Sequence, residues 1–433
     1  MTAARLAADL AAARTRSLGL LDPFDDEVLN RQHHPLMSPL VWDLAHVANY
    51  EDLWLLRALG RPAGRPEIDH LYDAFRQPRA VRAALPLLDP VAARSYGAEV
   101  RARALEGLAT DDLAGDGPDP LRRHGYVYAM VVQHEQQHAE TLLAAISLLP
   151  GDDVVDPPAA PADGPLVVAS PRPDEVLVPA GPFRMGSDDP WAYDNERPTH
   201  EVDLPAYRID AAPVTNARYL AFVEDGGYHD RRWWTDEGWR WRVDTGAEAP
   251  LHWTRDGAGW SRRRFATVEA VPGDEPVQHV CWHEASAFAR WDGKRLPTEA
   301  EWEKAAAWDP ATATSRPWPW GSAAPEAGSR ANLGQRRLGP APVGSYPDGV
   351  SALGCHQMVG DVWEWTSSRF EPYPGFRAFP YAEYSEVFWG DGYRVLRGGS
   401  WATDPTACRT TFRNWDLPIR RQIFAGFRCA RDA

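Results

Sequence analysis

Three helix-start signals constrain the first 150 residues of this chain to a helical bundle. Ser38-Pro39, Asp89-Pro90 and Asp119-Pro120 each place a capping side chain before proline, which suits the first turn of a helix. Together with the leucine- and alanine-rich N-terminus, they predict helices over residues 3–21, 38–60, 89–109 and 119–149. This pattern is typical of a four-helix bundle.

Three histidines on these predicted helices form a candidate metal site. His134 and His138 stand four residues apart, so both imidazoles leave the same helix face. His46 lies on the inward face of the second predicted helix, and bundles build metal sites from facing helices. Three neutral nitrogens without a carboxylate suit iron(II), copper or zinc, and the spacing alone does not choose among them.

Two other interpretations of these histidines remain open. The phrase His134-Glu135-Gln-Gln-His138 also fits the zinc-protease pattern, in which Glu135 would be the general base of a hydrolase. Alternatively, the histidines are structural and the protein is a non-catalytic ligand-binding module. The hydrolase should work with zinc and consume no O2, whereas the binding module should turn over nothing with any metal.

The chain changes character after the bundle. Residues 152–172 are rich in Pro, Ala, Asp and Gly and predict a linker. From Asp174 onward, short β-like runs alternate with Gly, Pro and Trp, and helices are predicted only over residues 215–224, 282–292 and a short stretch after Glu299. This half therefore reads as an irregular α+β domain with large loops, in which the many tryptophans hold the loops or form a binding surface.

Charge and cysteine content exclude some classes of function. The 433 residues carry a net charge of −15, which disfavours binding to nucleic acid or to an anionic membrane surface. No apolar run reaches the roughly 20 residues that a membrane helix needs. The four cysteines show no metal-binding or disulfide spacing, which fits a reducing cytoplasm.

A long connection between the second and third predicted helices contains Arg79 and Arg82. The simpler interpretation is a solvated loop, and the residues alone favour it. The functional interpretation is an arginine clamp for a substrate carboxylate.

Phrases throughout the second half resemble the formylglycine-generating-enzyme (sulfatase-modifying-factor) fold, a C-type-lectin-like domain. They are Val178-Pro-Ala-Gly-Pro-Phe183, Pro213-Val-Thr-Asn216, Pro276-Val277, Arg295-Leu-Pro-Thr-Glu299 with Glu301-Trp302-Glu303, Gly360-Asp-Val-Trp-Glu-Trp365, Arg397-Gly-Gly-Ser-Trp401 and Gly426-Phe-Arg-Cys429. The bundle, with Trp42-Asp-Leu-Ala-His46 and the His134–His138 phrase, looks like a DinB-type helical domain. In this order the two domains resemble the ergothioneine-biosynthesis sulfoxide synthases, also called hercynine oxygenases.

The resemblance implies a DinB-like four-helix bundle over residues 1–155, a linker over 156–173 and a substrate domain over 174–433. Formylglycine formation needs a redox-active cysteine pair before the final strand, and residues 412–422 contain no cysteine. The second domain therefore resembles that enzyme in its fold and not in its chemistry.

In the resembled family, three histidines that match His46, His134 and His138 hold non-haem iron, Fe(II). The implied substrates are γ-glutamylcysteine, hercynine and O2, and the implied product is a sulfoxide joined through the imidazole C2 carbon. The expected protein is a cytoplasmic monomer that binds neither nucleic acid nor membrane.

The same resemblance implies substrate-binding and catalytic residues. Trp415 would face the trimethylammonium group of hercynine, and Gln137 and Asn414 would add hydrogen bonds. Arg79, Arg82 and Arg420 would bind the two carboxylates of γ-glutamylcysteine. Asp416 would bind its ammonium group. Tyr381 would donate a proton or hydrogen atom, with Tyr384 as the alternative.

Overall fold

The computed structural model describes residues 2–159, 166, 168, 174–257, 259–325, 330–390 and 392–433. It divides into two compact units, Met1–Pro158 with Asp189–Trp191, and Ala159–Asp188 with Ala192–Ala433. The predicted linker, residues 156–173, lies largely outside the described residues. None of the helices in the described ranges combines the length and hydrophobicity that crossing a bilayer requires.

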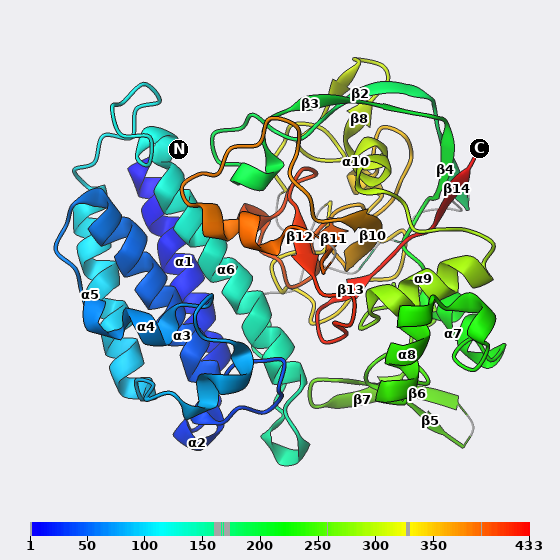
Figure 1. The fold of residues 1–433 in the computed structure, drawn as a ribbon, viewed down its shortest axis with the longest axis horizontal. Helices are drawn as coiled ribbons and strands as arrows, with labels where there is room; N and C mark the ends of the chain where they lie inside the picture. Colours follow the sequence, from blue (N-terminus) through cyan, green and yellow to red (C-terminus); the bar gives the residue numbers. More distant parts are fainter. Residues whose placement is uncertain are drawn as a thin grey trace. The chain divides into compact units, whose positions relative to one another are not determined.

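The first unit is a bundle of four long helices. The helices of this unit are α1 (Ala3–Leu21), α2 (Asp26–Asn30), α3 (Leu40–Glu51), α4 (Asp69–Tyr72), α5 (Pro90–Leu108) and α6 (Tyr126–Ser147). Helix α1 packs against α6, and α3 packs against both α5 and α6 (Figure 1). The helical path of α3 continues through a π-helical turn, Asp52–Leu56, and a 3-10 turn, Arg57–Leu59. The predicted four-helix bundle is therefore confirmed.

Capping residues explain where some of these helices begin or end. The hydroxyl of Thr2 accepts a hydrogen bond from the main-chain N–H of Arg5, and the carboxylate of Asp89 accepts one from that of Ala92. Each bond satisfies a donor that the first helical turn leaves unpaired. Gly60, at φ 76°, adopts the left-handed conformation that ends a helix after Leu59.

Two predicted helix starts are wrong in detail. Helix α6 begins at Tyr126 and not at Asp119-Pro120, because His124 (φ 56°) and Gly125 (φ 75°) are both left-handed and interrupt the helical path. Asp119 caps only an isolated turn, where its carboxylate accepts from the main-chain N–H of Leu121. Pro39 occupies the N-cap position of α3 instead of its first helical position.

The second unit contains several small sheets. Its strands are β1 (Glu175–Val178), β2 (Gly181–Met185), β3 (His200–Leu204), β4 (Tyr207–Asp210), β5 (Trp253–Asp256), β6 (Gly259–Arg264), β7 (Thr267–Ala270), β8 (Trp308–Asp309), β9 (Thr314–Ser315), β10 (Trp363–Arg369), β11 (Arg394–Arg397), β12 (Asn414–Asp416), β13 (Ala425–Gly426) and β14 (Ala430–Asp432). The described strands pair in the orders β1-β4-β14, β12-β11-β10-β13, β2-β3, β5-β6-β7 and β8-β9. In the four-stranded sheet, β10 runs parallel to β13, and the other neighbouring pairs are antiparallel.

The helices of the second unit are α7 (Asn216–Glu224), α8 (Asp236–Thr245), α9 (Trp282–Trp291) and α10 (Glu299–Ala307). The sequence predicts three of them and misses α8. That helix has almost no buried face, so the apolar periodicity that marks an amphipathic helix is missing. Its ends carry the usual signals, a Thr235 side chain that accepts from the N–H of Gly238 and a left-handed Gly246.

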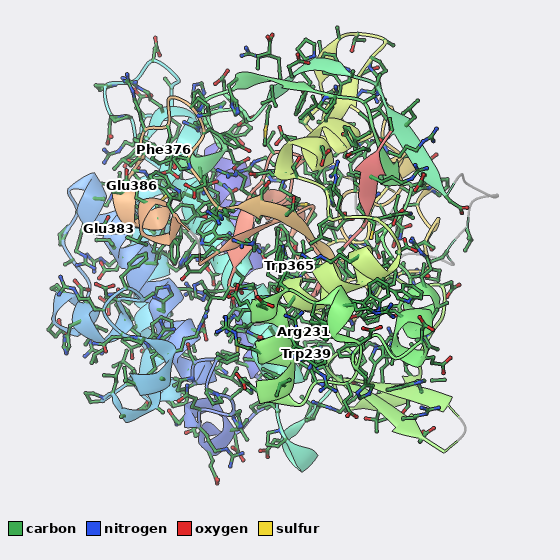
Figure 2. The ribbon with its side chains drawn as sticks, turned by 45° about the vertical axis from the view of Figure 1, so that its right-hand side comes forward. Arg231, Trp239, Trp365, Phe376, Glu383 and Glu386 are labelled. Carbon is green, nitrogen blue, oxygen red and sulfur yellow. The ribbon has the colours of Figure 1, made fainter. Side chains whose placement is uncertain are left out.

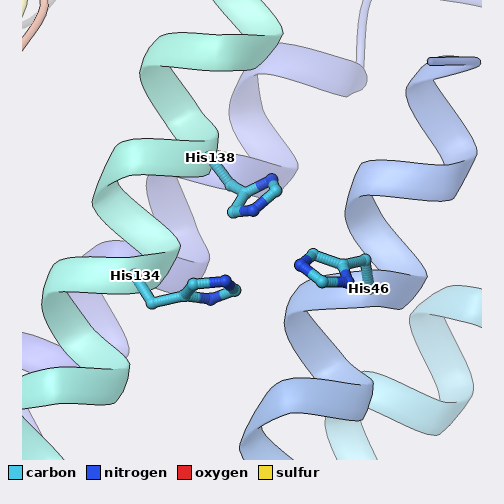
Figure 3. Close-up of side chains that lie close together, drawn as sticks. All are labelled: His46, His134 and His138. Carbon is cyan, nitrogen blue, oxygen red and sulfur yellow. The ribbon is translucent and has the colours of Figure 1, made fainter. Parts of the chain in front are cut away.

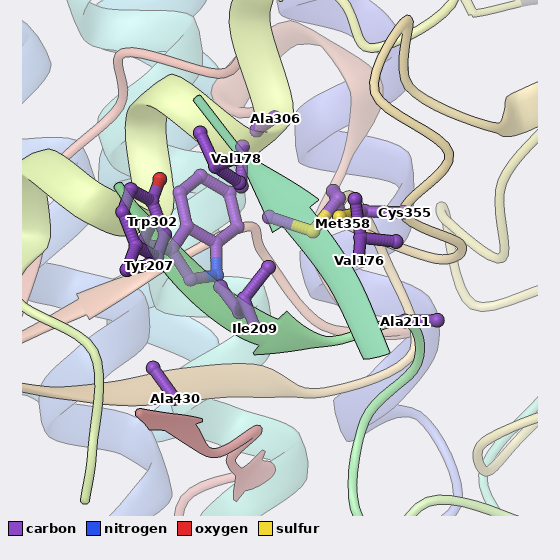
Figure 4. Close-up of a cluster of buried hydrophobic side chains, with 11 residues drawn as sticks. Val176, Val178, Tyr207, Ile209, Ala211, Trp302, Ala306, Cys355, Met358 and Ala430 are labelled. Atoms are coloured by element: carbon purple, nitrogen blue, oxygen red, sulfur yellow. The ribbon is translucent and has the colours of Figure 1, made fainter. Parts of the chain in front are cut away.

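The family phrases meet in the core of this unit. Trp302 of α10 is fully buried against residues of β1 and β4, including Val178 and Ile209 (Figure 4). Its indole N–H donates to the Glu364 carboxylate at 2.8 Å, and that carboxylate also pairs with Arg428 at 2.6 Å. Buried hydrogen bonds thus join phrases that are far apart in the sequence. The residues that make these bonds stabilise the fold.

The tryptophans of the second unit mostly hold loops and strands together. Trp365, labelled in Figure 2, is buried. Its indole N–H donates to the main-chain carbonyl of Val280 at 3.0 Å. Trp239 of α8 is only half-buried, and the guanidinium of Arg231 lies 6.0 Å from its ring. Large aromatics therefore act as cross-links in a unit with little regular structure.

Candidate metal centre and substrate residues

Three histidines converge inside the helical bundle. His134 and His138 lie one turn apart on α6, and His46 lies on α3, which packs against α6. One ligand nitrogen from each can be chosen so that all three lie within 4.8 Å of one another (Figure 3). The ring centroids are 4.6 to 5.2 Å apart. The bundle therefore brings together the three residues that the sequence nominated as metal ligands.

Hydrogen bonds orient two of the three rings. The Nδ1 atom of His46 lies 2.7 Å from the main-chain carbonyl of Tyr72, and the Nδ1 atom of His138 lies 2.8 Å from the Asp43 carboxylate. Both partners accept hydrogen bonds, so each Nδ1 carries the proton and each Nε2 keeps a free lone pair. The His134 ring stacks on Tyr50, with 3.7 Å between the centroids.

The surroundings of His46 and His134 keep these two imidazoles neutral. Burial, reinforced by the neighbouring histidines, lowers the pKa of His46 and of His134 well below the ordinary value. Since only the neutral ring offers a lone pair to a metal ion, this is the protonation state that coordination requires.

Asp43 places a buried carboxylate beside the cluster. Its second oxygen, Oδ2, is buried and has no hydrogen-bond partner among the described residues. Three neutral nitrogens beside such a carboxylate fit a divalent transition metal, which supplies the missing positive charge. Asp43 is not among the residues predicted from the sequence, although its position three residues before His46 puts it on the same helix face.

Glu135 is committed to a buried ion network and is not available as a base. Its carboxylate pairs with Arg14 at 2.6 Å and with Arg101 at 2.8 Å, and both arginines also pair with Glu51. Burial opposes ionisation, but the two arginines prevail and lower the pKa of Glu135 below its ordinary value. A general base for hydrolysis needs the opposite, a raised pKa and access to water. This geometry argues against the zinc-hydrolase alternative.

The connection that carries the predicted arginine clamp is not a plain loop. Residues Arg79–Ala84 form a 3-10 helix, in which Arg79 is exposed and Arg82 is only 5% exposed. The Arg82 guanidinium lies 3.5 Å from the centroid of the Trp42 ring and donates to Ser38 Oγ at 2.7 Å. Burial lowers the pKa of Arg82 to about 10. Arg82 thus contacts the tryptophan on which His46 stacks.

Three predicted residues of the second unit belong to one aromatic cluster. The ring of Tyr384 lies edge-on to Tyr381 at 6.1 Å and to Trp415 at 5.8 Å. Trp415 also stacks on Phe370, with 4.1 Å between the centroids. Tyr384 stacks on the buried Tyr193 at 4.4 Å. These contacts give Tyr384 a packing role beside Tyr381.

Two residues that the sequence analysis missed fix the tyrosine segment. The Asp194 carboxylate accepts from the N–H of Phe379 at 3.1 Å and from the Ser385 hydroxyl at 2.7 Å. The Asn195 amide donates to the same hydroxyl at 3.2 Å. Phe379 and Ser385 flank the short helix η10 (Ala382–Tyr384), so these bonds hold the segment at both of its ends. Such contacts join residues nearly 200 positions apart, so no local pattern announces them.

The remaining predicted residues lie on β12, just after it and on α6. Asn414 and Asp416 are the first and last residues of β12, and both are half-buried. The Asp416 carboxylate pairs with Arg420 at 3.1 Å, and Arg420 is buried, unlike an ordinary surface arginine. Gln137 is half-buried on α6 between the two histidines.

The cysteines are not part of the histidine cluster. All four, Cys281, Cys355, Cys408 and Cys429, are buried free thiols. Burial raises the pKa of the Cys355 thiol to about 11, which keeps it protonated and unreactive.

Comparison with known proteins assigns both units. Residues 9–142 match the DinB superfamily, and residues 165–433 match the sulfatase-modifying factor enzyme 1-like domain. These matches confirm the predicted fold class.

Two hercynine oxygenases match this chain over nearly its whole length. The chain is 52% identical to the hercynine oxygenase of Mycolicibacterium smegmatis, over 99% of this chain and 98% of that protein. It is also 52% identical to the hercynine oxygenase of Mycobacterium tuberculosis, over 99% of both chains. A formylglycine-generating enzyme of Streptomyces coelicolor matches 64% of this chain at 36% identity, over 95% of its own length. This chain therefore belongs to the hercynine oxygenase family.

Proposed function

We propose that this protein is an iron(II)- and O2-dependent sulfoxide synthase that joins the sulfur of γ-glutamylcysteine to the imidazole C2 carbon of hercynine. The observation that carries the proposal is the convergence of His46, His134 and His138 in a chain that matches hercynine oxygenases over 99% of its length. One oxygen atom of O2 would remain in the sulfoxide and the other would leave as water, taking up the hydrogens of the thiol and of C2.

His46, His134 and His138 would hold the iron through their Nε2 atoms. When bound, iron(II) would supply the chemistry that imidazoles lack, namely coordination of a thiolate and activation of O2. The protein's contribution is to keep the rings of His46 and His134 neutral and to fix the rings of His46 and His138 by hydrogen bonds at Nδ1.

The aromatic cluster around Trp415 supports hercynine binding. A trimethylammonium group has no N–H to donate, so it is bound by aromatic faces. Trp415 and Tyr384 supply such faces within one cluster. Asn414 and Gln137 would hydrogen-bond the imidazole or the carboxylate of hercynine.

The charged residues suit γ-glutamylcysteine, which carries two carboxylates and one ammonium group. Arg79, Arg82 and Arg420 would take the carboxylates, and Asp416 would take the ammonium group. Asp416 and Arg420 pair with each other in this structure. On binding, the dipeptide would place a carboxylate beside Arg420 and its ammonium group beside Asp416.

Removing one member of this clamp should weaken dipeptide binding selectively. We expect Asp416→Asn and Arg79→Ala each to raise the KM for γ-glutamylcysteine roughly 10-fold, because a charge-assisted hydrogen bond contributes about 1.5–3 kcal/mol. Steady-state kinetics with γ-glutamylcysteine and with free cysteine measure the effect, and the change for cysteine should be smaller. Equal losses with both thiols would show that these residues do not recognise the dipeptide.

The function itself is tested by reconstitution. Metal-free protein is loaded anaerobically with iron(II) or zinc, mixed with γ-glutamylcysteine and hercynine, and exposed to O2. Sulfoxide formation and O2 uptake with iron alone support the proposal. Hydrolytic turnover with zinc without O2 uptake would support the hydrolase instead, and no turnover with either metal would leave a binding module.

We also propose a cytoplasmic location and a monomeric state. The four free thiols are compatible with a reducing compartment, where disulfides are rare. Sedimentation of the purified protein would test the monomeric state.

A further inference from the structure

A single carboxylate links the two helices that carry the histidines. Asp43 lies on α3, three residues before His46, and is only 2% exposed. Its Oδ1 atom lies 2.8 Å from the Nδ1 atom of His138 on α6. Helix α3 therefore contributes one candidate ligand of its own and also the hydrogen-bond acceptor for a ligand on the facing helix.

We propose that Asp43 is a positioning residue of the metal centre, an inference that rests on the proposed function. By accepting the Nδ1 proton of His138, it fixes the ring and leaves Nε2 as the coordinating atom. In metal sites generally, such a second-layer carboxylate sets the tautomer and raises the basicity of the ligand. Asp43 would thereby decide how strongly His138 binds the ion.

The three histidines differ in this respect. The acceptor for His46 is the neutral main-chain carbonyl of Tyr72, whereas the acceptor for His138 is a carboxylate. Hydrogen bonds to an ionised acceptor are about twice as strong as those between neutral groups. His138 should therefore be the more strongly donating ligand of the two, and its contribution should depend on the charge of Asp43.

The second oxygen of Asp43 indicates that its negative charge contributes to metal binding and does not stabilise the fold. Oδ2 is buried without a hydrogen-bond donor among the described residues. Arg82 attracts Asp43 electrostatically, but its side chain donates to Gln77 and Ser38. An Oδ2 atom that is buried without a donor destabilises the metal-free protein, and a divalent cation at the histidines would reverse that cost.

Removing the charge of Asp43 should have opposite effects on the metal-free and the metal-bound protein. Asp43→Asn keeps the shape and an oxygen that can accept from His138, but it removes the charge. In the metal-free protein it should leave the Tm unchanged or raised. In the same variant metal binding should weaken, and Asp43→Ala, which removes the acceptor as well, should weaken it further, by about 10–100-fold relative to the wild type.

Asp52 provides a matched control. It is also a fully buried aspartate, nine residues further along the same helical path. Its carboxylate accepts from the N–H groups of Gly64 and Arg65 and from the Tyr96 hydroxyl. Because these contacts stabilise the fold, Asp52→Asn should lower the Tm of the metal-free protein and leave its metal affinity unchanged.

The experiment uses the full chain, stripped of metal and titrated anaerobically with iron(II) and, as a spectroscopic probe, with cobalt(II). Wild type, Asp43→Asn, Asp43→Ala and Asp52→Asn are compared for dissociation constant, cobalt absorption spectrum and metal-free Tm. Weaker binding and an altered spectrum in Asp43→Asn, at an unchanged or higher metal-free Tm, support the inference.

Other outcomes are separable. Wild-type affinity in both Asp43 variants, or a metal-free Tm that falls in Asp43→Asn as it does in Asp52→Asn, would overturn the positioning role while leaving the proposed function intact. A wild-type protein that binds neither metal would overturn the proposed function itself. If Asp43→Ala does not fold, Asp43→Asn alone decides.

Discussion

Replacing His46 with alanine is expected to remove the bound iron and to abolish sulfoxide formation, and the same result is expected for His134→Ala and His138→Ala. Each substitution deletes one of the three imidazoles that converge in the described part of the bundle. Loss of an outer partner of a ligand typically reduces affinity or activity by about 10–100-fold, and loss of the ligand itself should exceed that.

Iron content per chain after anaerobic loading, together with product formation, measures this effect. His70→Ala is a suitable control, because His70 is an exposed histidine of the same unit, on α4. Circular dichroism should show that all four variants retain their helices. Full iron content and activity in His46→Ala would show that the ligand set is wrong.

The sequence predicts the helical bundle well because its helices carry local signals. Capping side chains and prolines mark most of the starts, and Gly60 marks an end. The predicted start of α6 is wrong because the backbone conformation changes just before Tyr126. Two successive left-handed residues, His124 and Gly125, separate the capped turn at Asp119 from the helix. A left-handed residue other than glycine is uncommon, so a single His-Gly pair inside a helical pattern does not by itself predict the interruption.

The histidine cluster is only partly predictable. The spacing of His134 and His138 fixes a shared face, and the inward side of the second helix selects His46. The partners that orient them do not follow from spacing, because Asp43 and His138 are 95 residues apart and meet only when α3 packs on α6. The same holds for Glu135, whose ion pairs with Arg14 and Arg101 come from two other helices.

The second unit shows the limit of local patterns more clearly. Its helix α8 lacks an apolar face, and its strands are short. Resemblance identified the fold from phrases whose residues, such as Trp302, Glu364 and Arg428, contact one another. Long-range hydrogen bonds therefore explain why the phrases belong together, although no periodicity within any of them predicts the contacts.

The second large effect is expected from Tyr381→Phe. From the same bound substrates, the reaction can form the C–S bond or oxidise the thiol sulfur alone, and a phenol beside the reacting oxygen can supply a proton or hydrogen atom that favours the first course. The variant loses one hydroxyl and keeps its ring, so its edge-on contact with Tyr384 should persist. We therefore expect it to bind iron and both substrates and to consume O2, with the main product changed from the sulfoxide to γ-glutamylcysteine sulfinate.

Mass spectrometry of the two products, with O2 consumption recorded in parallel, decides which tyrosine is responsible. Tyr384→Phe is the matched control, because Tyr384 lies in the same short segment but stacks on the buried Tyr193. If Tyr384 only packs, its variant should retain the wild-type ratio of sulfoxide to sulfinate. An unchanged ratio in Tyr381→Phe together with a changed ratio in Tyr384→Phe would transfer the donor role to Tyr384. The segment would then hold the stacked tyrosine, and not the edge-on one, as its reactive group.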